Sequence, residues 1–155
     1  MEQRYAAVCF DLFGTLVEDD GRPVDGAREA LQAMPAQRWA IVTSCGAQLA
    51  RALIARAGLP EPPFLVTSDD VVRNKPDPDG YLAAASRLRV PPEQILVVED
   101  SRQGIAAGRA AGMDVLAILR GRSISTASEA LYFVERLSAV RWAVESDGTV
   151  SFSTT

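Results

Sequence analysis

Short apolar segments alternate along this chain with segments whose apolar residues recur at helical spacing. The apolar segments are rich in Val, Ile and Leu and almost free of polar residues, which is typical of strands buried on both faces of a parallel sheet. Strands that alternate with helices in this way predict a doubly wound, Rossmann-like α/β fold. The expected strands are residues 6–10, 39–43, 64–66, 95–98 and 115–119, and the expected helices are residues 26–34, 46–57, 79–88 and 101–111.

The C-terminal part of the chain has a different pattern. Residues 126–137 have helical spacing, and residues 141–152 place Asp147-Gly148 between two alternating segments. An Asp-Gly pair in that position favours a tight turn, so we expect a terminal β-hairpin. The chain has 155 residues, no internal repeat and no linker. We therefore expect residues 1–155 to form one domain.

Composition excludes several classes of chemistry. The chain has no histidine, which rules out imidazole bases, Ser-His-Asp triads and histidine-based zinc sites. The net charge is −4 without a basic run, so we expect no nucleic-acid partner. Two cysteines, a polar N-terminus and the lack of a long apolar stretch predict a cytoplasmic protein that binds no membrane.

Polar residues follow the expected strands at the point where each strand ends. Asp11 follows the first strand, Ser44 the second, and Glu99-Asp100 the fourth. Lys75, the one lysine among sixteen basic residues, lies in the loop after the third strand. In doubly wound folds the functional site lies beyond the carboxyl ends of the strands, so we expect these side chains to meet there.

Four segments, in order, resemble the four motifs of the haloacid dehalogenase superfamily of hydrolases. Residues 10–16 (FDLFGTL) resemble the first motif, residues 42–44 (VTS) the second, residues 75–78 (KPDP) the third and residues 98–101 (VEDS) the fourth. The resemblance extends over about residues 5 to 120 and is strongest to the sugar-phosphatase branch. It implies the strand order 3-2-1-4-5 and a phosphatase that forms an aspartyl-phosphate intermediate.

The resemblance also implies a nucleophile and a metal site. Asp11 corresponds to the nucleophile, because phosphoryl transfer through an aspartyl-phosphate needs an exposed carboxylate. The cofactor implied is Mg²⁺, which prefers oxygen ligands. Its ligands would be Asp11, the backbone carbonyl of Phe13 and Asp100, with Glu99 close by.

The remaining motif residues correspond to groups that bind the phosphate. Lys75 would place a positive charge against the phosphoryl group and the nucleophile, and therefore counts as both catalytic and phosphate-binding. Ser44, together with Thr43, would donate hydroxyl hydrogen bonds beside backbone amides at the next helix start. The expected substrate is a phosphorylated small molecule or an exposed phosphate on a larger one.

The same residues also have purely structural interpretations. Asp11 could be a turn residue, and Glu99-Asp100 could cap the helix that follows, since acidic residues favour helix N-termini. Ser44 could be an ordinary N-cap, and Lys75 a solvated charge in a loop. Only the positions of these side chains in space can separate these interpretations.

Phe13 departs from the pattern of the family. Phosphatases of this superfamily usually carry a second Asp two residues after the nucleophile, as the general acid and base, and here that position is Phe13. Loss of a general acid typically costs about 10²–10⁴ in rate. An aromatic residue there also resembles the 2-haloacid dehalogenase branch, which needs no metal. The acidic pair at positions 99 and 100 favours the metal-dependent phosphatase instead.

The segment after the first motif is also shorter than in related enzymes, which insert a helical cap there. Only residues 12–42 separate Asp11 from Thr43, enough for a short flap at about residues 16–25 and one helix. We therefore expect a capless site that is open or is closed by a second copy of the chain. The alternative function is a catalytically weak relative that binds Mg²⁺ and phosphate as a sensor or interaction module.

Overall fold

Buried apolar segments form the centre of a parallel β-sheet in the computed structural model, which describes residues 3–155. The sheet has six strands in the order β3-β2-β1-β4-β5-β6, and every neighbouring pair is parallel. The predicted order 3-2-1-4-5 is confirmed and extended by one edge strand. The strands are β1 (Ala7–Phe10), β2 (Trp39–Val42), β3 (Leu65–Val66), β4 (Ile95–Glu99), β5 (Asp114–Ile118) and β6 (Tyr132–Val134).

The predicted helix over residues 126–137 is wrong. That segment contains the 3-10 helix η3 (Ile124–Ala127), then β6, and then the 3-10 helix η4 (Leu137–Ala139). β6 lies against β5, with Ala117 opposite Phe133. Without β6 the backbone groups along that edge of β5 would have no strand partner, and this tertiary pairing outweighs the weak helical spacing of the segment.

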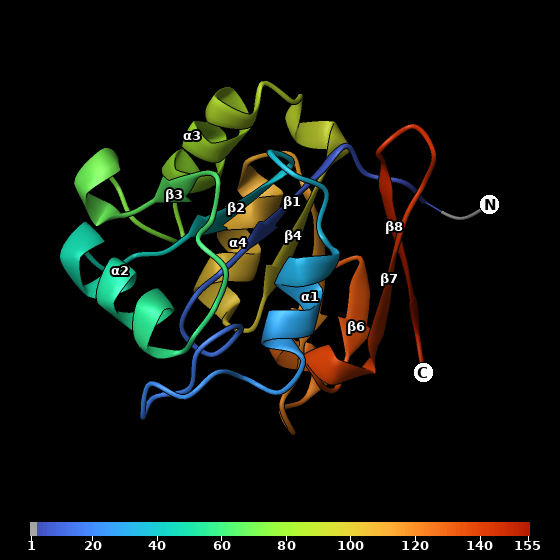
Figure 1. The fold of residues 1–155 in the computed structure, drawn as a ribbon, viewed down its shortest axis with the longest axis horizontal. Helices are drawn as coiled ribbons and strands as arrows, with labels where there is room; N and C mark the ends of the chain where they lie inside the picture. Colours follow the sequence, from blue (N-terminus) through green and yellow to red (C-terminus); the bar gives the residue numbers. More distant parts are fainter. Residues whose placement is uncertain (1–2) are drawn as a thin grey trace.

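Helices cover both faces of the sheet (Figure 1). One face packs against α1 (Ala27–Ala33) and α2 (Ala47–Arg56), and the other against α3 (Asp79–Leu88) and α4 (Arg102–Ala110). Side chains of β1 to β5 alternate between these two cores, as the two-residue period of a strand requires. The 3-10 helices η1 (Ser68–Asp70) and η2 (Pro92–Gln94) lie in the connections before α3 and β4.

The predicted C-terminal hairpin is confirmed. β7 (Val140–Val144) and β8 (Val150–Thr154) pair antiparallel and pack on the same face of the sheet as α1 (Figure 1). The ring of Trp142 meets that of Phe10 edge-on, with 5.9 Å between centroids. The hairpin therefore covers apolar surface of β1 that α1 and α2 leave open.

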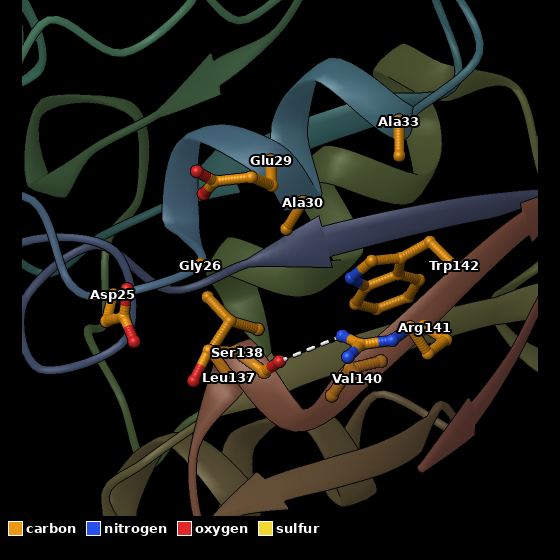
Figure 2. Close-up of a pocket in the computed structure, with 10 residues that line it drawn as sticks. All are labelled: Asp25, Gly26, Glu29, Ala30, Ala33, Leu137, Ser138, Val140, Arg141 and Trp142. Atoms are coloured by element: carbon orange, nitrogen blue, oxygen red, sulfur yellow. Dashed lines mark hydrogen bonds between the residues drawn. The ribbon is translucent and has the colours of Figure 1, made fainter. Parts of the chain in front are cut away.

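A pocket of about 290 Å³ lies between α1 and the start of β7 (Figure 2). At its edge Gly26 has a φ of 89° and approaches Ser138 so closely that a Cβ atom would lie 2.7 Å from the Ser138 Cα. On the side of the pocket opposite α1, Arg141 donates a hydrogen bond of 3.1 Å to the Ser138 carbonyl. None of the predicted site residues lines this pocket. The lining residues are Asp25, Gly26, Glu29, Ala30, Ala33, Leu137, Ser138, Val140, Arg141 and Trp142.

The parallel strands bring their carboxyl ends to one edge of the sheet. Asp11 comes directly after β1, Thr43 directly after β2, and Glu99 is the last residue of β4. Between residues 3 and 155 no helix is long and apolar enough to cross a membrane.

Candidate active site

Lys75 joins the two strand ends at the centre of the sheet. Its Nζ donates to Asp11 Oδ1 at 2.8 Å, to Glu99 Oε1 at 2.6 Å and to the carbonyl of Val42 at 3.0 Å. An ammonium group has three protons, so these contacts use all of them. Only about 10% of the Lys75 side chain is exposed, which excludes a solvated loop charge.

Glu99 is fully buried and acts as the anchor of this lysine. Besides Lys75, its Oε1 accepts a hydrogen bond of 2.7 Å from the Tyr81 hydroxyl, and its Oε2 accepts one of 3.2 Å from the backbone N–H of Asp100. Gly104 of α4 lies against the carboxylate so closely that a Cβ there would overlap it. Both Glu99 oxygens therefore have protein partners. Helix capping is not their role, because Ser101 caps α4 instead.

Thr15 connects Asp11 with Asp100. Its buried hydroxyl lies 3.1 Å from Asp11 Oδ2 and 3.3 Å from Asp100 Oδ1. Gly14, with a φ of 81°, leaves room for the Asp100 carboxylate, which a Cβ at position 14 would overlap. The turn after β1 therefore holds the two carboxylates side by side.

Burial dominates the electrostatics of these groups. It raises the pKa of Asp11 to about 6, although the Lys75 charge opposes the shift, and with the Asp11 charge it raises the pKa of Glu99 to about 7. Burial lowers the pKa of Lys75, but Asp11 and Glu99 raise it more, and the net direction is upward. At neutral pH Lys75 is therefore a fixed positive charge against the Asp11 carboxylate.

Three carboxylates come close enough together to hold a cation. One oxygen from each of Asp11, Glu99 and Asp100 lies within 4.8 Å of the others. A set of hard carboxylate oxygens suits Mg²⁺, so the residues present fit the cofactor that the motifs imply. The Asp11 and Asp100 oxygens are more accessible than those of Glu99, which lie behind Lys75 and Tyr81.

The predicted phosphate-binding hydroxyls lie at the end of β2. Thr43 is buried, and its Oγ1 accepts a hydrogen bond of 3.3 Å from the backbone N–H of Cys45. Ser44 is exposed and does not cap α2, because the N-cap is Gly46. The Ser44 side chain is therefore left accessible at the edge of the sheet where Asp11 lies.

Phe13 lies two residues after Asp11, with about one third of its surface exposed. An exposed aromatic ring at this position cannot donate or accept a proton. In the described residues the carboxylates grouped with Asp11 are those of Glu99 and Asp100. Glu99 is bound by Lys75 and Asp100 by Thr15, so neither replaces the carboxylate that the family usually has at position 13.

Three residues that contact the carboxylate cluster escaped the sequence analysis: Thr15, Tyr81 and Arg122. Thr15 lies inside the first motif, so its hydroxyl four residues after the nucleophile was an available signal. Tyr81 has the spacing of a core aromatic residue, and its bond to Glu99 depends on the packing of α3. Arg122 follows β5, and its Nη2 donates to Asp100 Oδ2 at 3.2 Å.

A family model of known hydrolases matches the part of the chain that contains most of the candidate site. Residues 17–112, more than half of the chain, match the family model of haloacid dehalogenase-like hydrolases. The chain therefore belongs to the haloacid dehalogenase-like hydrolases, the family that its four motifs predicted. The match includes Lys75 and the Glu99-Asp100 pair and begins after Asp11.

The relatives it matches are phosphatases. It is 48% identical to hexitol phosphatase A of Escherichia coli over 80 residues, which cover 52% of this chain and 37% of that protein. It is 37% identical to validoxylamine A 7'-phosphate phosphatase of Streptomyces hygroscopicus over 122 residues, which cover 77% of this chain and 57% of that protein. The chain thus spans less than two thirds of the length of either relative.

Solved structures share the fold. A hydrolase from Pseudomonas syringae aligns with a TM-score of 0.74 and 22% identity, covering 85% of this chain and 94% of that one. A haloacid dehalogenase family hydrolase from Deinococcus radiodurans, solved with bound phosphate and sodium, aligns with a TM-score of 0.75 and 23% identity, covering 84% and 90%. These two structures confirm the predicted α/β fold.

Proposed function

We propose that this chain is a Mg²⁺-dependent phosphatase that hydrolyses phosphate monoesters or anhydrides through an aspartyl-phosphate on Asp11. The observation that carries the proposal is the position of Lys75, whose ammonium lies 2.8 Å from the Asp11 carboxylate at the carboxyl edge of the sheet. A carboxylate can attack a phosphate only where cations offset the repulsion between the two. Lys75 supplies one such cation from within the chain.

The proposed reaction has two displacement steps. In the first step an Asp11 oxygen forms a bond to phosphorus, and the bond between phosphorus and the leaving-group oxygen breaks. In the second step a water oxygen forms a bond to the same phosphorus and the bond between phosphorus and the Asp11 oxygen breaks, which releases inorganic phosphate and restores the Asp11 carboxylate. The proton that this water loses to solvent balances the one that the leaving-group oxygen takes up from solvent. In this proposal Lys75 stabilises the negative charge in both steps, and the hydroxyls of Ser44 and Thr43 bind phosphoryl oxygens.

Asp11 and Asp100 would hold the Mg²⁺ ion, together with the backbone carbonyl of Phe13. A bound cation would offset charge on the phosphoryl oxygens and on the nucleophile. Glu99 would act mainly through Lys75, because its own oxygens already accept hydrogen bonds from Lys75, Tyr81 and the Asp100 backbone.

The substrate is a phosphorylated small molecule or an exposed phosphate on a larger one. The two relatives described above are named for a hexitol and for validoxylamine A 7'-phosphate, which favours small phosphate esters. Between β1 and β2 the chain has a short loop and α1, so we propose that the site is open or is closed by a second copy.

The test measures both trapping and turnover. Beryllium fluoride with Mg²⁺ should form a stable mimic of the phosphorylated Asp11, visible by fluorine NMR, and the protein should turn over acyl, aryl and sugar phosphates. Asp11→Asn is the control, because the amide oxygen can still accept the Lys75 hydrogen bond while the nucleophilic carboxylate is lost. The variant should fold and lose all hydrolysis.

Each outcome has a definite meaning. Retained hydrolysis in folded Asp11→Asn removes Asp11 from the nucleophile role. Trapping without turnover of any of the three phosphates supports the alternative, a module that binds Mg²⁺ and phosphate, which the lack of an acid at Phe13 favours. Full turnover in excess chelator excludes the metal-dependent mechanism.

A further inference from the structure

Arg122 occupies one side of the candidate metal site. It lies in the loop after β5, and a tight turn in which its N–H donates to the Leu119 carbonyl at 3.0 Å brings it back toward the sheet. Arg120 and Gly121 form that turn with φ values of 52° and 79°. The guanidinium is held from two sides, by the Leu119 carbonyl at 3.2 Å and by Asp100 Oδ2 at 3.2 Å.

Arg122 contacts Oδ2 of the Asp100 carboxylate, one of the three carboxylates that are grouped closely enough to hold a cation. The other oxygen, Oδ1, lies 3.3 Å from the Thr15 hydroxyl, and the whole carboxylate is only 12% exposed. A metal ion that binds between Asp11 and Asp100 would approach this same carboxylate. Arg122 and such an ion would both be attracted by the negative charge of Asp100 and would repel each other.

The balance of charge explains why a guanidinium lies there. Asp11, Glu99 and Asp100 bring three carboxylates within 4.8 Å, and Lys75 contributes one positive charge to the first two of them. Asp100 has no contact with Lys75 and pairs with Arg122 instead. Close like charges are unfavourable, so a second cation at Asp100 stabilises the cluster.

We propose that Arg122 is an internal counter-cation that competes with the divalent cation for Asp100 and thereby weakens metal binding. The inference rests on the proposed function, since it takes Asp100 as a metal ligand. The Arg122 side chain is 42% exposed and belongs to a surface loop, so it can leave Asp100 without disturbing the core. Metal binding then requires one partly exposed ion pair to break.

The chain offers a matched control in Arg120. It lies in the same loop and donates to the Gly14 carbonyl at 2.7 Å, and it also pairs with Glu18. These partners lie beside the site, but neither belongs to the carboxylate cluster. Removal of the Arg120 charge changes the net charge of the loop by the same amount and leaves Asp100 with its partner.

The experiment titrates Mg²⁺ into the substrate-free protein by isothermal calorimetry at constant ionic strength. The proteins are the unmodified chain, Arg122→Gln, Arg120→Gln and Asp100→Ala, each checked for folding by thermal melting. Arg122→Gln should bind Mg²⁺ about 2- to 5-fold more tightly, the range expected when one partly exposed ion pair no longer opposes binding. Arg120→Gln should change the affinity by less than about twofold, and Asp100→Ala should bind weakly.

Failure of this inference can be distinguished from failure of the proposed function. Equal or weaker Mg²⁺ binding by Arg122→Gln, or the same gain in Arg120→Gln, overturns the competition at Asp100 while the phosphatase proposal stands. If the unmodified chain and Arg122→Gln both fail to bind Mg²⁺, or Asp100→Ala binds as tightly as the unmodified chain, the metal site itself is wrong and both proposals fall.

Discussion

Gly104 of α4 packs directly against the Glu99 carboxylate, so a methyl group added at this position would displace the residue that binds Lys75. In Gly104→Ala the new Cβ would overlap all three atoms of the Glu99 carboxylate group, which is fully buried and has no free space to enter. Glu99 would have to turn away from Lys75 and Tyr81 and break hydrogen bonds of 2.6 and 2.7 Å. The substitution therefore tests whether the buried carboxylate stabilises the site.

The expected cost follows from two opposing effects. Ala is favoured over Gly in a helix by about 1 kcal/mol, and position 104 lies within α4. Breaking a buried ion pair costs about 3–5 kcal/mol, because it leaves a charge without a partner. We expect Gly104→Ala to lower the free energy of unfolding by roughly 2–4 kcal/mol, and to impair hydrolysis because Lys75 loses its anchor.

Urea denaturation of a double-mutant cycle measures this cost directly. In a Glu99→Ala background the carboxylate is absent, so Gly104→Ala should there be neutral or stabilising by up to about 1 kcal/mol. The coupling energy between the two positions should therefore be at least about 2 kcal/mol. If Gly104→Ala has the same effect in both backgrounds, Glu99 does not occupy the position described and the reasoning fails.

Three further predictions concern the acid position, the metal ligands and pH. Phe13→Asp should raise turnover of alkyl phosphates by up to about 10²–10⁴, less for aryl and least for acyl phosphates, in steady-state assays; an equal change for all three would show that position 13 is not the acid position. Asp100→Ala should weaken Mg²⁺ binding more than Glu99→Gln does, because the Glu99 oxygens are engaged by Lys75 and Tyr81; calorimetry showing the reverse order would make Glu99 the principal ligand. Burial raises the pKa of Asp11 to about 6 and that of Glu99 to about 7, so the folded protein holds more protons than the unfolded chain between about pH 4 and 7. The contribution of these two carboxyl groups to the stability of the folded state is therefore complete below pH 4 and is lost as the pH rises through 7. With a chelator present to remove bound metal, the urea midpoint should be lower at pH 8 than at pH 5. A midpoint that rises over this range would contradict the prediction.

The strand ends show how far local sequence predicts a site in this fold. Asp11, Ser44 and Glu99-Asp100 each follow an apolar segment, and in a parallel sheet such positions share one edge. Lys75 was predicted as a site residue from its motif and its uniqueness, and in the structure its ammonium lies against Asp11 and Glu99. These residues were predictable because a strand and the turn after it are determined by short-range pattern.

Other features depend on groups that are distant in the chain. β6 forms because β5 presents an open edge, and no local pattern in residues 126–137 reveals that edge. Tyr81 reaches Glu99 from α3, and Arg122 reaches Asp100 from the loop after β5, at sequence separations of 18 and 22 residues. The sequence alone determined the α/β class, the edge of the sheet that holds the site and its charged residues. Only the tertiary structure decided that Asp11 and Glu99 both bind Lys75, and that Asp11 and Asp100 stay more accessible than Glu99, because burial and hydrogen-bond partners are set by packing between elements.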